Sequence, residues 1–94
     1  MSKSIISNDR LCWVCGTPHN LHRHHVYGGP CRNLSETYGC WIYLCVYHHT
    51  GSNQAIHFNH NLDMLVRKQT QRIWEEHYGK THEDFRNIFG KSYL

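Results

Sequence analysis

The sequence has no long apolar segment, no signal-like start and no repeat. No stretch approaches the roughly 20 apolar residues of a membrane-spanning helix, because His, Arg, Asn or Gly interrupts every hydrophobic segment. The first residues are MSKSIISNDR, with a lone Lys and no apolar run of signal-peptide length, so we expect neither export nor disulfides. We therefore predict a soluble intracellular protein with reduced thiols and no membrane partner.

A chain of 94 residues is long enough for one domain and too short for two. Such a small domain buries a thin core and needs a further source of stability. Five Cys and ten His indicate bound metal as that source, because thiolate and imidazole both suit zinc. We expect residues 1–94 to form a single metal-stabilised domain.

The chain is mildly basic, with a formal charge of +3 and a pI near 8.7. Protonation of any of its histidines raises this charge further. The balance is compatible with a polyanionic partner such as nucleic acid, but many soluble domains share it. Charge alone therefore does not identify the partner, which must be inferred from the motifs.

Two short segments have the aromatic and β-branched content of strands. Residues 21–27 read LHRHHVY and stop at Gly28-Gly29-Pro30, and residues 41–45 read WIYLC. The two segments can pair as a hairpin, with residues 28–40 as a long functional loop between them.

Five apolar residues and one His recur at helical spacing in the second half of the chain, namely Leu62, Leu65, Val66, Ile73, Trp74 and His77. Gly79 follows as a natural C-cap, and Thr81-x-x-Asp84 resembles a capping signal for a second helix that carries Phe85, Ile88 and Phe89. We predict one long and one short C-terminal helix within residues 62–90, with a mainly scaffolding role.

Two ligand pairs flank the predicted hairpin, Cys12-x-x-Cys15 and Cys45-x-x-His48. Each pair sits on one small turn, with Gly16 able to adopt a positive φ, and together they match a tetrahedral Cys₃His zinc site. Such a site is closed, so its zinc would be structural. The alternative is two unrelated buried thiols and a surface His. Cys31 and Cys40 are left over, and their spacing does not favour them as ligands.

These motifs together resemble the zinc-containing HNH endonucleases, also called ββα-metal or His-Me finger nucleases. The resemblance lies in Cys-x-x-Cys-Gly, Leu-His-x-His-His-Val, Leu-Cys-x-x-His-His and a later His, and it covers about residues 12–57. It implies an α+β fold with a small ββα-metal, treble-clef-like core. The ending Phe-Gly-Lys-Ser-Tyr-Leu is similar to short phage-encoded HNH proteins, which would place the protein in the cytoplasm of a bacterial host.

The resemblance also implies a catalytic site on the histidines. His24 matches the first ligand of a catalytic divalent cation, His25 matches the general base, and His49 matches the second ligand. The family's last ligand lies one helical turn later, at Asn53, but Thr50-Gly51-Ser52 can act as an insertion that favours His57 instead.

Two features depart from the family pattern. A regular strand would turn His24 and His25 to opposite faces and place His22 beside His24, so His22 stays in reserve as a ligand together with Asn53. The Asn that orients the family's base is missing, because its position falls near Cys40. Asn33, Asn53 and Asn59 are the candidates to replace it.

The chemistry expected of this site is hydrolysis of DNA phosphodiester bonds. A neutral imidazole can take a proton from water at physiological pH, and one cation, Mg²⁺ or Mn²⁺, can polarise the phosphate and stabilise the departing oxygen. The expected phosphate contacts are Arg23, Arg32, Arg67, Lys68 and Arg72. The last three lie on the long helix and are equally typical of a solvated helix face.

The main rival is a non-catalytic zinc module that binds nucleic acid or protein; it explains the cysteines equally well and the histidines less well. A zinc hydrolase of another substrate is disfavoured, because the chain lacks a His-x-x-x-His helix signature with a Glu base. The sequence leaves open the cleavage specificity, nicking against double-strand cutting, and monomer against homodimer.

Overall fold

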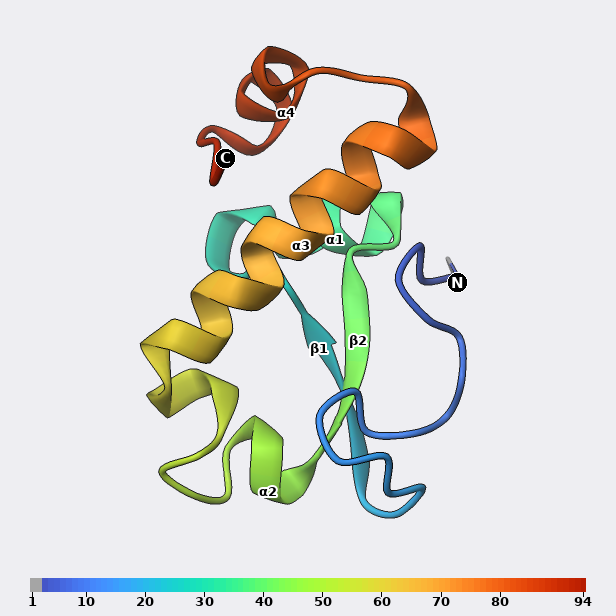
Figure 1. The fold of residues 1–94 in the computed structure, drawn as a ribbon, viewed down its shortest axis with the longest axis vertical. Helices are drawn as coiled ribbons and strands as arrows, with labels where there is room; N and C mark the ends of the chain where they lie inside the picture. Colours follow the sequence, from blue (N-terminus) through green and yellow to red (C-terminus); the bar gives the residue numbers. More distant parts are fainter. Residues whose placement is uncertain (1–2) are drawn as a thin grey trace.

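The computed structural model describes residues 3–94, which form a two-stranded antiparallel sheet and four α-helices (Figure 1). In chain order the elements are β1 (Leu21–His25), the 3-10 turn η1 (Gly29–Cys31), α1 (Arg32–Tyr38), β2 (Trp41–Cys45), α2 (Val46–His49), the 3-10 turn η2 (Ile56–Phe58), α3 (His60–Tyr78) and α4 (His82–Phe89). The α+β class, the two strands and the long and short C-terminal helices were predicted from the sequence and are confirmed.

The strands pair as the predicted hairpin, in a register that runs from Leu21 opposite Cys45 to His25 opposite Trp41. Four of the five β2 residues are buried, as its aromatic and branched composition predicts. The first strand is shorter than predicted, because β1 ends at His25. Tyr27 instead turns into the helical core, where its ring packs 5.2 Å from that of Phe85.

The prediction of a loop over residues 28–40 is wrong, because residues 32–38 form α1. The helix is stabilised by tertiary contacts, which the spacing of apolar residues in the sequence does not predict. The buried Ser35 hydroxyl donates to the Tyr27 carbonyl at 2.8 Å and accepts from the Tyr27 N–H at 3.1 Å. Gly39 ends the helix with φ 72°, and a Cβ there would lie 2.3 Å from the Lys3 carbonyl oxygen.

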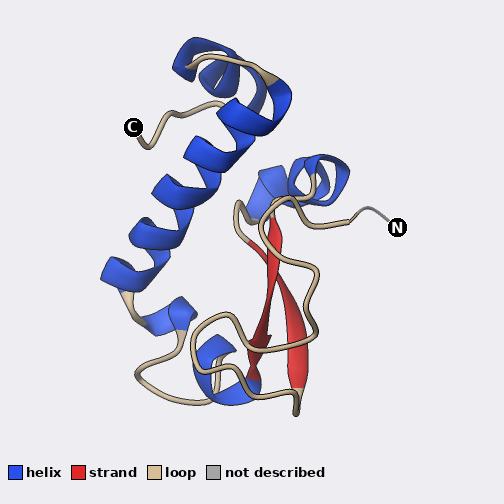
Figure 2. Ribbon diagram, turned by 45° about the vertical axis from the view of Figure 1, so that its right-hand side comes forward, coloured by secondary structure: helices blue, strands red, loops and turns tan. Residues whose placement is uncertain are grey.

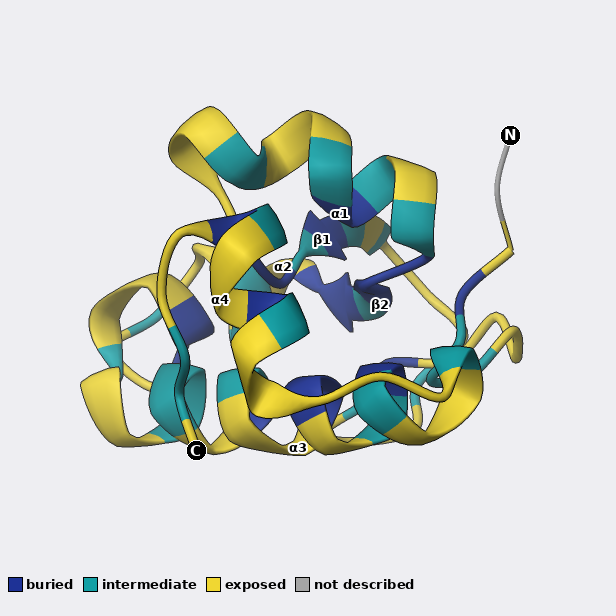
Figure 3. Ribbon diagram, turned by 90° about the horizontal axis from the view of Figure 1, so that it is seen from above, coloured by how far each residue is buried: buried dark blue, intermediate teal, exposed yellow. Residues whose placement is uncertain are grey.

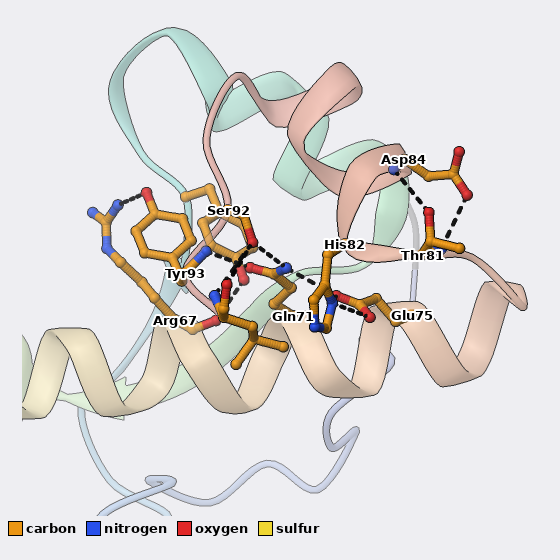
Figure 4. Close-up of polar contacts among 10 residues, drawn as sticks. Arg67, Gln71, Glu75, Thr81, His82, Asp84, Ser92 and Tyr93 are labelled. Atoms are coloured by element: carbon orange, nitrogen blue, oxygen red, sulfur yellow. Dashed lines mark hydrogen bonds and ion pairs between the residues drawn. The ribbon is translucent and has the colours of Figure 1, made fainter.

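Gly79 ends the long helix and Thr81 caps the short one as predicted, whereas the cap at the start of the long helix, Asn59, was not predicted. The Asn59 side chain accepts the Leu62 N–H at 3.1 Å, and Gly79 closes α3 in the left-handed conformation. Thr81 and Asp84 form a reciprocal capping box at the start of α4, even though Asp stands where Glu or Gln is usual (Figure 4).

The hairpin has α1 at one end and α2 at the other, while α3 runs diagonally past it (Figures 1 and 2). Buried residues gather where the hairpin, α3 and α4 face one another (Figure 3). The core there includes Leu44, Val66 and Trp74, and the Trp74 and Phe85 rings lie 5.3 Å apart. No helix in residues 3–94 is both long enough and apolar enough to cross a membrane.

The last residues of the chain return along α3 and are bonded to it (Figure 4). The buried Gln71 amide accepts the Tyr93 N–H at 2.7 Å and donates to the Ser92 hydroxyl at 3.0 Å. The Arg67 guanidinium donates to the Tyr93 hydroxyl at 2.7 Å. These bonds attach the C-terminal residues to the middle of α3.

Candidate metal centres

The four predicted knuckle residues come together, with one ligand atom from each lying within 4.8 Å of the others. Cys12 and Cys15 lie on a turn before β1, Cys45 ends β2, and His48 belongs to α2. Gly16 closes the first turn with φ 76°, and its N–H donates to the Cys12 carbonyl at 2.8 Å. The spacing in the sequence therefore identified this cluster correctly.

The separations within the cluster fit a tetrahedral ion. Two thiolates on tetrahedral zinc lie about 3.8 Å apart, and a thiolate and an imidazole about 3.6 Å apart, given the usual zinc–ligand bond lengths. The Cys15 and Cys45 sulfurs are separated by 3.8 Å. His48 Nδ1 lies 3.8 Å from the Cys12 sulfur and 3.3 Å from the Cys45 sulfur. The four residues can hold a metal ion in a closed site, consistent with structural zinc.

Cys12 in the cluster and Cys40 outside it have opposite pKa shifts, and the pKa of Cys15 in the cluster is also raised. Burial raises the pKa of Cys12, but hydrogen bonds from the backbone at Cys15, Cys45 and Val14 together outweigh it and lower that pKa to about 6. Cys12 is therefore disposed to be a thiolate, the form that binds metal. Burial raises the pKa of Cys40 to about 12, which keeps it a thiol. Cys31 donates its S–H to the Phe89 carbonyl at 3.3 Å.

A second cluster consists of three imidazoles, His24 from β1, His49 from α2 and His57 from η2, with ligand atoms within 4.8 Å of one another. The Nε2 atoms of His49 and His57 are 3.1 Å apart. Two imidazoles on one tetrahedral ion lie about 3.3 Å apart, because metal–nitrogen bonds are about 2.0–2.1 Å long. The resemblance to HNH nucleases had selected these three residues as ligands.

His24 provides the strongest sign that this cluster suits a cation. The residue is 6% exposed, and its Nε2 is buried without a hydrogen-bond partner among residues 3–94. Burial, assisted by the nearby His49 and His57, lowers the pKa of His24 to about 3, so the ring is neutral and keeps a lone pair. A buried lone pair without a donor is costly unless an ion or a donor satisfies it.

The two reserve ligands lie outside this cluster. His22 has its Nδ1 3.0 Å from the Nδ1 of His49, which is not the nitrogen that approaches His57. Asn53 is exposed in the turn between α2 and η2. His57 is thus the third member of the cluster with His24 and His49.

His25 follows His24 directly but has different neighbours, as alternation along a strand requires. Its Nε2 lies 2.7 Å from a carboxylate oxygen of Glu36 on α1. The other Glu36 oxygen pairs with the Arg23 guanidinium, which stacks 3.8 Å above the Trp41 ring. The hydrogen bond with His25, together with the charge of Arg23, lowers the pKa of Glu36 despite some desolvation, so the carboxylate stays ionised.

Sequence reasoning missed Glu36, which lies 11 residues from its partner in the segment predicted as a loop. No pattern in the sequence marks Glu36, because it meets His25 only through the packing of α1 against the histidine strand. Of the three Asn considered for this role, Asn59 caps α3, Asn53 is exposed, and Asn33 only lines a cavity beside His25.

The histidine cluster and His25 open into one cavity of about 280 Å³. Its lining consists of Arg23, His24, His25, Gly28, Gly29, Arg32, His49 and His57. A neighbouring cavity of about 420 Å³ is lined by Arg23, His25, Arg32, Asn33 and Glu36. Imidazole donors, a carboxylate-bound imidazole and two guanidinium groups therefore converge on one hollow that could receive a phosphate.

The predicted phosphate contacts do not share one surface. Arg23 and Arg32 line the histidine cavity. On α3, Lys68 and Arg72 are exposed, whereas Arg67 donates to Asp63 at 3.0 Å. Arg67 also donates to the Tyr93 hydroxyl (Figure 4). Only the first two line the histidine cavity, although Arg67 is near enough to help lower the pKa of His24.

Comparison of the chain with protein-family models, curated proteins and solved structures finds no match. The functional argument therefore rests on the chemistry of the two clusters and their cavity.

Proposed function

We propose that this protein is a metal-dependent endonuclease of the HNH type that hydrolyses DNA phosphodiester bonds. The observation that carries the proposal is the single cavity shared by His25, the three clustered imidazoles and two arginines. The finer description of the fold belongs to the same proposal. A hairpin followed by the metal-binding α2 is the order expected of a ββα-metal, treble-clef-like core.

His25 acts as the general base, and Glu36 positions it. An imidazole that donates its Nε2–H to a carboxylate keeps its lone pair on Nδ1. That lone pair can take a proton from water, and the Glu36 carboxylate then stabilises the imidazolium that forms. The 2.7 Å contact between the two side chains supports this division of roles.

Arg23 and Arg32 bind the phosphate that is to be cut. Guanidinium groups suit phosphate because they offer several donors in one plane and stay charged. Arg23 is held by Glu36 and by stacking on Trp41, so it loses little freedom when the phosphate binds. Its bond to Glu36 also couples phosphate binding to the orientation of His25.

His24, His49 and His57 hold the catalytic cation and leave room for the substrate. When bound, a divalent cation polarises the phosphate and stabilises charge on the departing oxygen. Three imidazoles without a carboxylate suit Mn²⁺ and the later transition ions better than Mg²⁺, which prefers oxygen ligands. We therefore expect Mn²⁺ to support cleavage at lower concentration than Mg²⁺.

The test is nicking of supercoiled plasmid with Mn²⁺, with Mg²⁺ and with a chelator. We expect His25→Ala to lower the nicking rate roughly 10²- to 10⁴-fold, the usual worth of a general base. Binding of divalent cation and of DNA should be nearly unchanged, because His25 is outside the ligand cluster. His19→Ala is the matched control, since His19 is exposed and lies before β1.

The alternative is the non-catalytic zinc module, which predicts a different outcome. A wild-type protein that contains zinc and binds DNA but nicks it with neither cation would establish that reading. Normal nicking by His25→Ala would leave a nuclease but remove His25 as its base.

A further inference from the structure

We infer that His22 is a positioning residue that holds the ring of His49 ready to bind a cation. His49 is approached by an imidazole at each of its two nitrogens. Its Nε2 lies 3.1 Å from His57 Nε2, on the side of the ligand cluster. Its Nδ1 lies 3.0 Å from His22 Nδ1, and the His22 and His49 rings meet nearly at right angles, at 80°. The inference rests on the three-histidine centre of the proposed function.

The tautomer of His49 follows from these contacts. A neutral imidazole carries one proton, so a ring that binds a cation through Nε2 must hold that proton on Nδ1. Metal-binding histidines almost always donate this second N–H to an acceptor, which fixes both tautomer and ring orientation. Here the acceptor within reach is the Nδ1 lone pair of His22.

The position of His22 makes this role compatible with the fold. It stands two residues before His24 on β1, and alternation along the strand places both on one face. One strand thus supplies a ligand and the support for another ligand. His22 is exposed, so its own proton can stay on Nε2 and be donated to water.

His49 has particular need of such support. It ends α2, a helix of four residues without a side-chain cap, and it is only half-buried. So short a helix does little by itself to fix a side chain at its last position. His22 does not serve as a fourth ligand, because it meets the ring nitrogen that faces away from His57.

The experiment compares His22→Leu with His22→Asn in protein that carries one equivalent of zinc in the knuckle, titrated calorimetrically with Co²⁺. The Asn side chain places its oxygen on Cγ, where His22 has Nδ1, and so keeps an acceptor. We expect His22→Leu to weaken Co²⁺ binding about 10- to 100-fold, the usual effect of losing such a partner, and His22→Asn to restore it to within a few-fold. His19→Leu is the control, because His19 is exposed and lies outside β1.

A second readout needs no added metal. Nitrogen NMR of the histidine rings should show His49 with its proton on Nδ1 in the wild type and in His22→Asn, and a mixture of tautomers in His22→Leu.

The inference would be overturned by Co²⁺ binding of wild-type strength in both variants, or by a His49 tautomer that does not depend on the residue at position 22. Either result would leave the nuclease proposal standing. Equal loss of Co²⁺ binding in both variants, with an altered Co²⁺ absorption spectrum, would make His22 a ligand. Failure of the wild type to bind a second ion would instead remove the three-histidine centre.

Discussion

The two candidate metal centres meet at adjacent residues, His48 and His49, yet they differ in donors, closure and surroundings. The knuckle combines three sulfurs with one nitrogen, the donor set of a closed tetrahedral site. The histidine cluster offers three nitrogens and opens into a cavity with two arginines. Successive helical residues point about 100° apart, so α2 can send neighbouring side chains to different centres. A closed candidate metal site and an open one can therefore share one turn of helix.

The comparison also suggests an order of dependence. Cys45 precedes α2 and His48 lies within it, so an ion in the knuckle would tie both ends of this helix to the turn that carries Cys12 and Cys15. His49 is then oriented by a helix that the first ion holds in place. The histidine centre should need the knuckle, whereas the knuckle should not need the histidine centre.

The largest expected effect is loss of the fold when the closed centre is broken. We expect about one tightly bound zinc per chain and expect Cys45→Ser to abolish the cooperative thermal transition, because zinc binding in small domains is worth roughly 10 kcal/mol or more of folding free energy. Elemental analysis and circular dichroism would measure both. Cys31→Ser is the control, since Cys31 lies outside the cluster and a serine can still donate to the Phe89 carbonyl. A well-folded sample without zinc would contradict the structural role.

Substitution of the neighbouring histidines provides a sharper test, because one substitution should unfold the protein and the other should abolish only its nicking activity. We expect His48→Ala to unfold the chain, and His49→Ala to stay folded with a melting temperature within a few degrees of the wild type. Nicking by His49→Ala should fall roughly 100-fold or more, since several kcal/mol of charge stabilisation are lost with the cation. Plasmid nicking and thermal melts of both variants would decide. Similar behaviour of the two variants would remove the distinction between the centres.

The smallest expected effect concerns DNA binding along α3. Lys68 is exposed, so Lys68→Ala should lower DNA affinity and reduce the slope of log affinity against log salt by about 0.9, without changing stability. Arg67→Ala should do the same but also lower the melting temperature, because it loses its bonds to Asp63 and Tyr93. Arg10→Ala, in the segment that leads to the knuckle, is the control. Binding titrations over a range of salt would measure the slopes, and an unchanged slope for Lys68→Ala would move the DNA path away from α3.

The elements that sequence reasoning located depend on local rules. The knuckle ligands were identifiable because two residues on one tight turn keep their spacing in any fold, as Cys12 and Cys15 do. A repeating apolar face predicts the α3 helix, and Gly79 predicts its end because glycine can adopt the left-handed conformation. Thr81 and Asp84 cap α4 through bonds made within one turn.

Tertiary structure alone decided how the distant parts meet. The sequence favoured His24 and His57 as partners of His49 only through the family resemblance and kept His22 and Asn53 in reserve. The path of the chain through η2 brings His57 to the Nε2 of His49, and β1 places His22 at its Nδ1. The same holds for Glu36, which contacts His25 because α1 packs against the hairpin. Gly39, at the end of α1, lies close to the Lys3 carbonyl. Periodicity and spacing record contacts between residues a few positions apart. The proposed active site is assembled from side chains that the folded backbone brings together from four separate elements, β1, α1, α2 and η2.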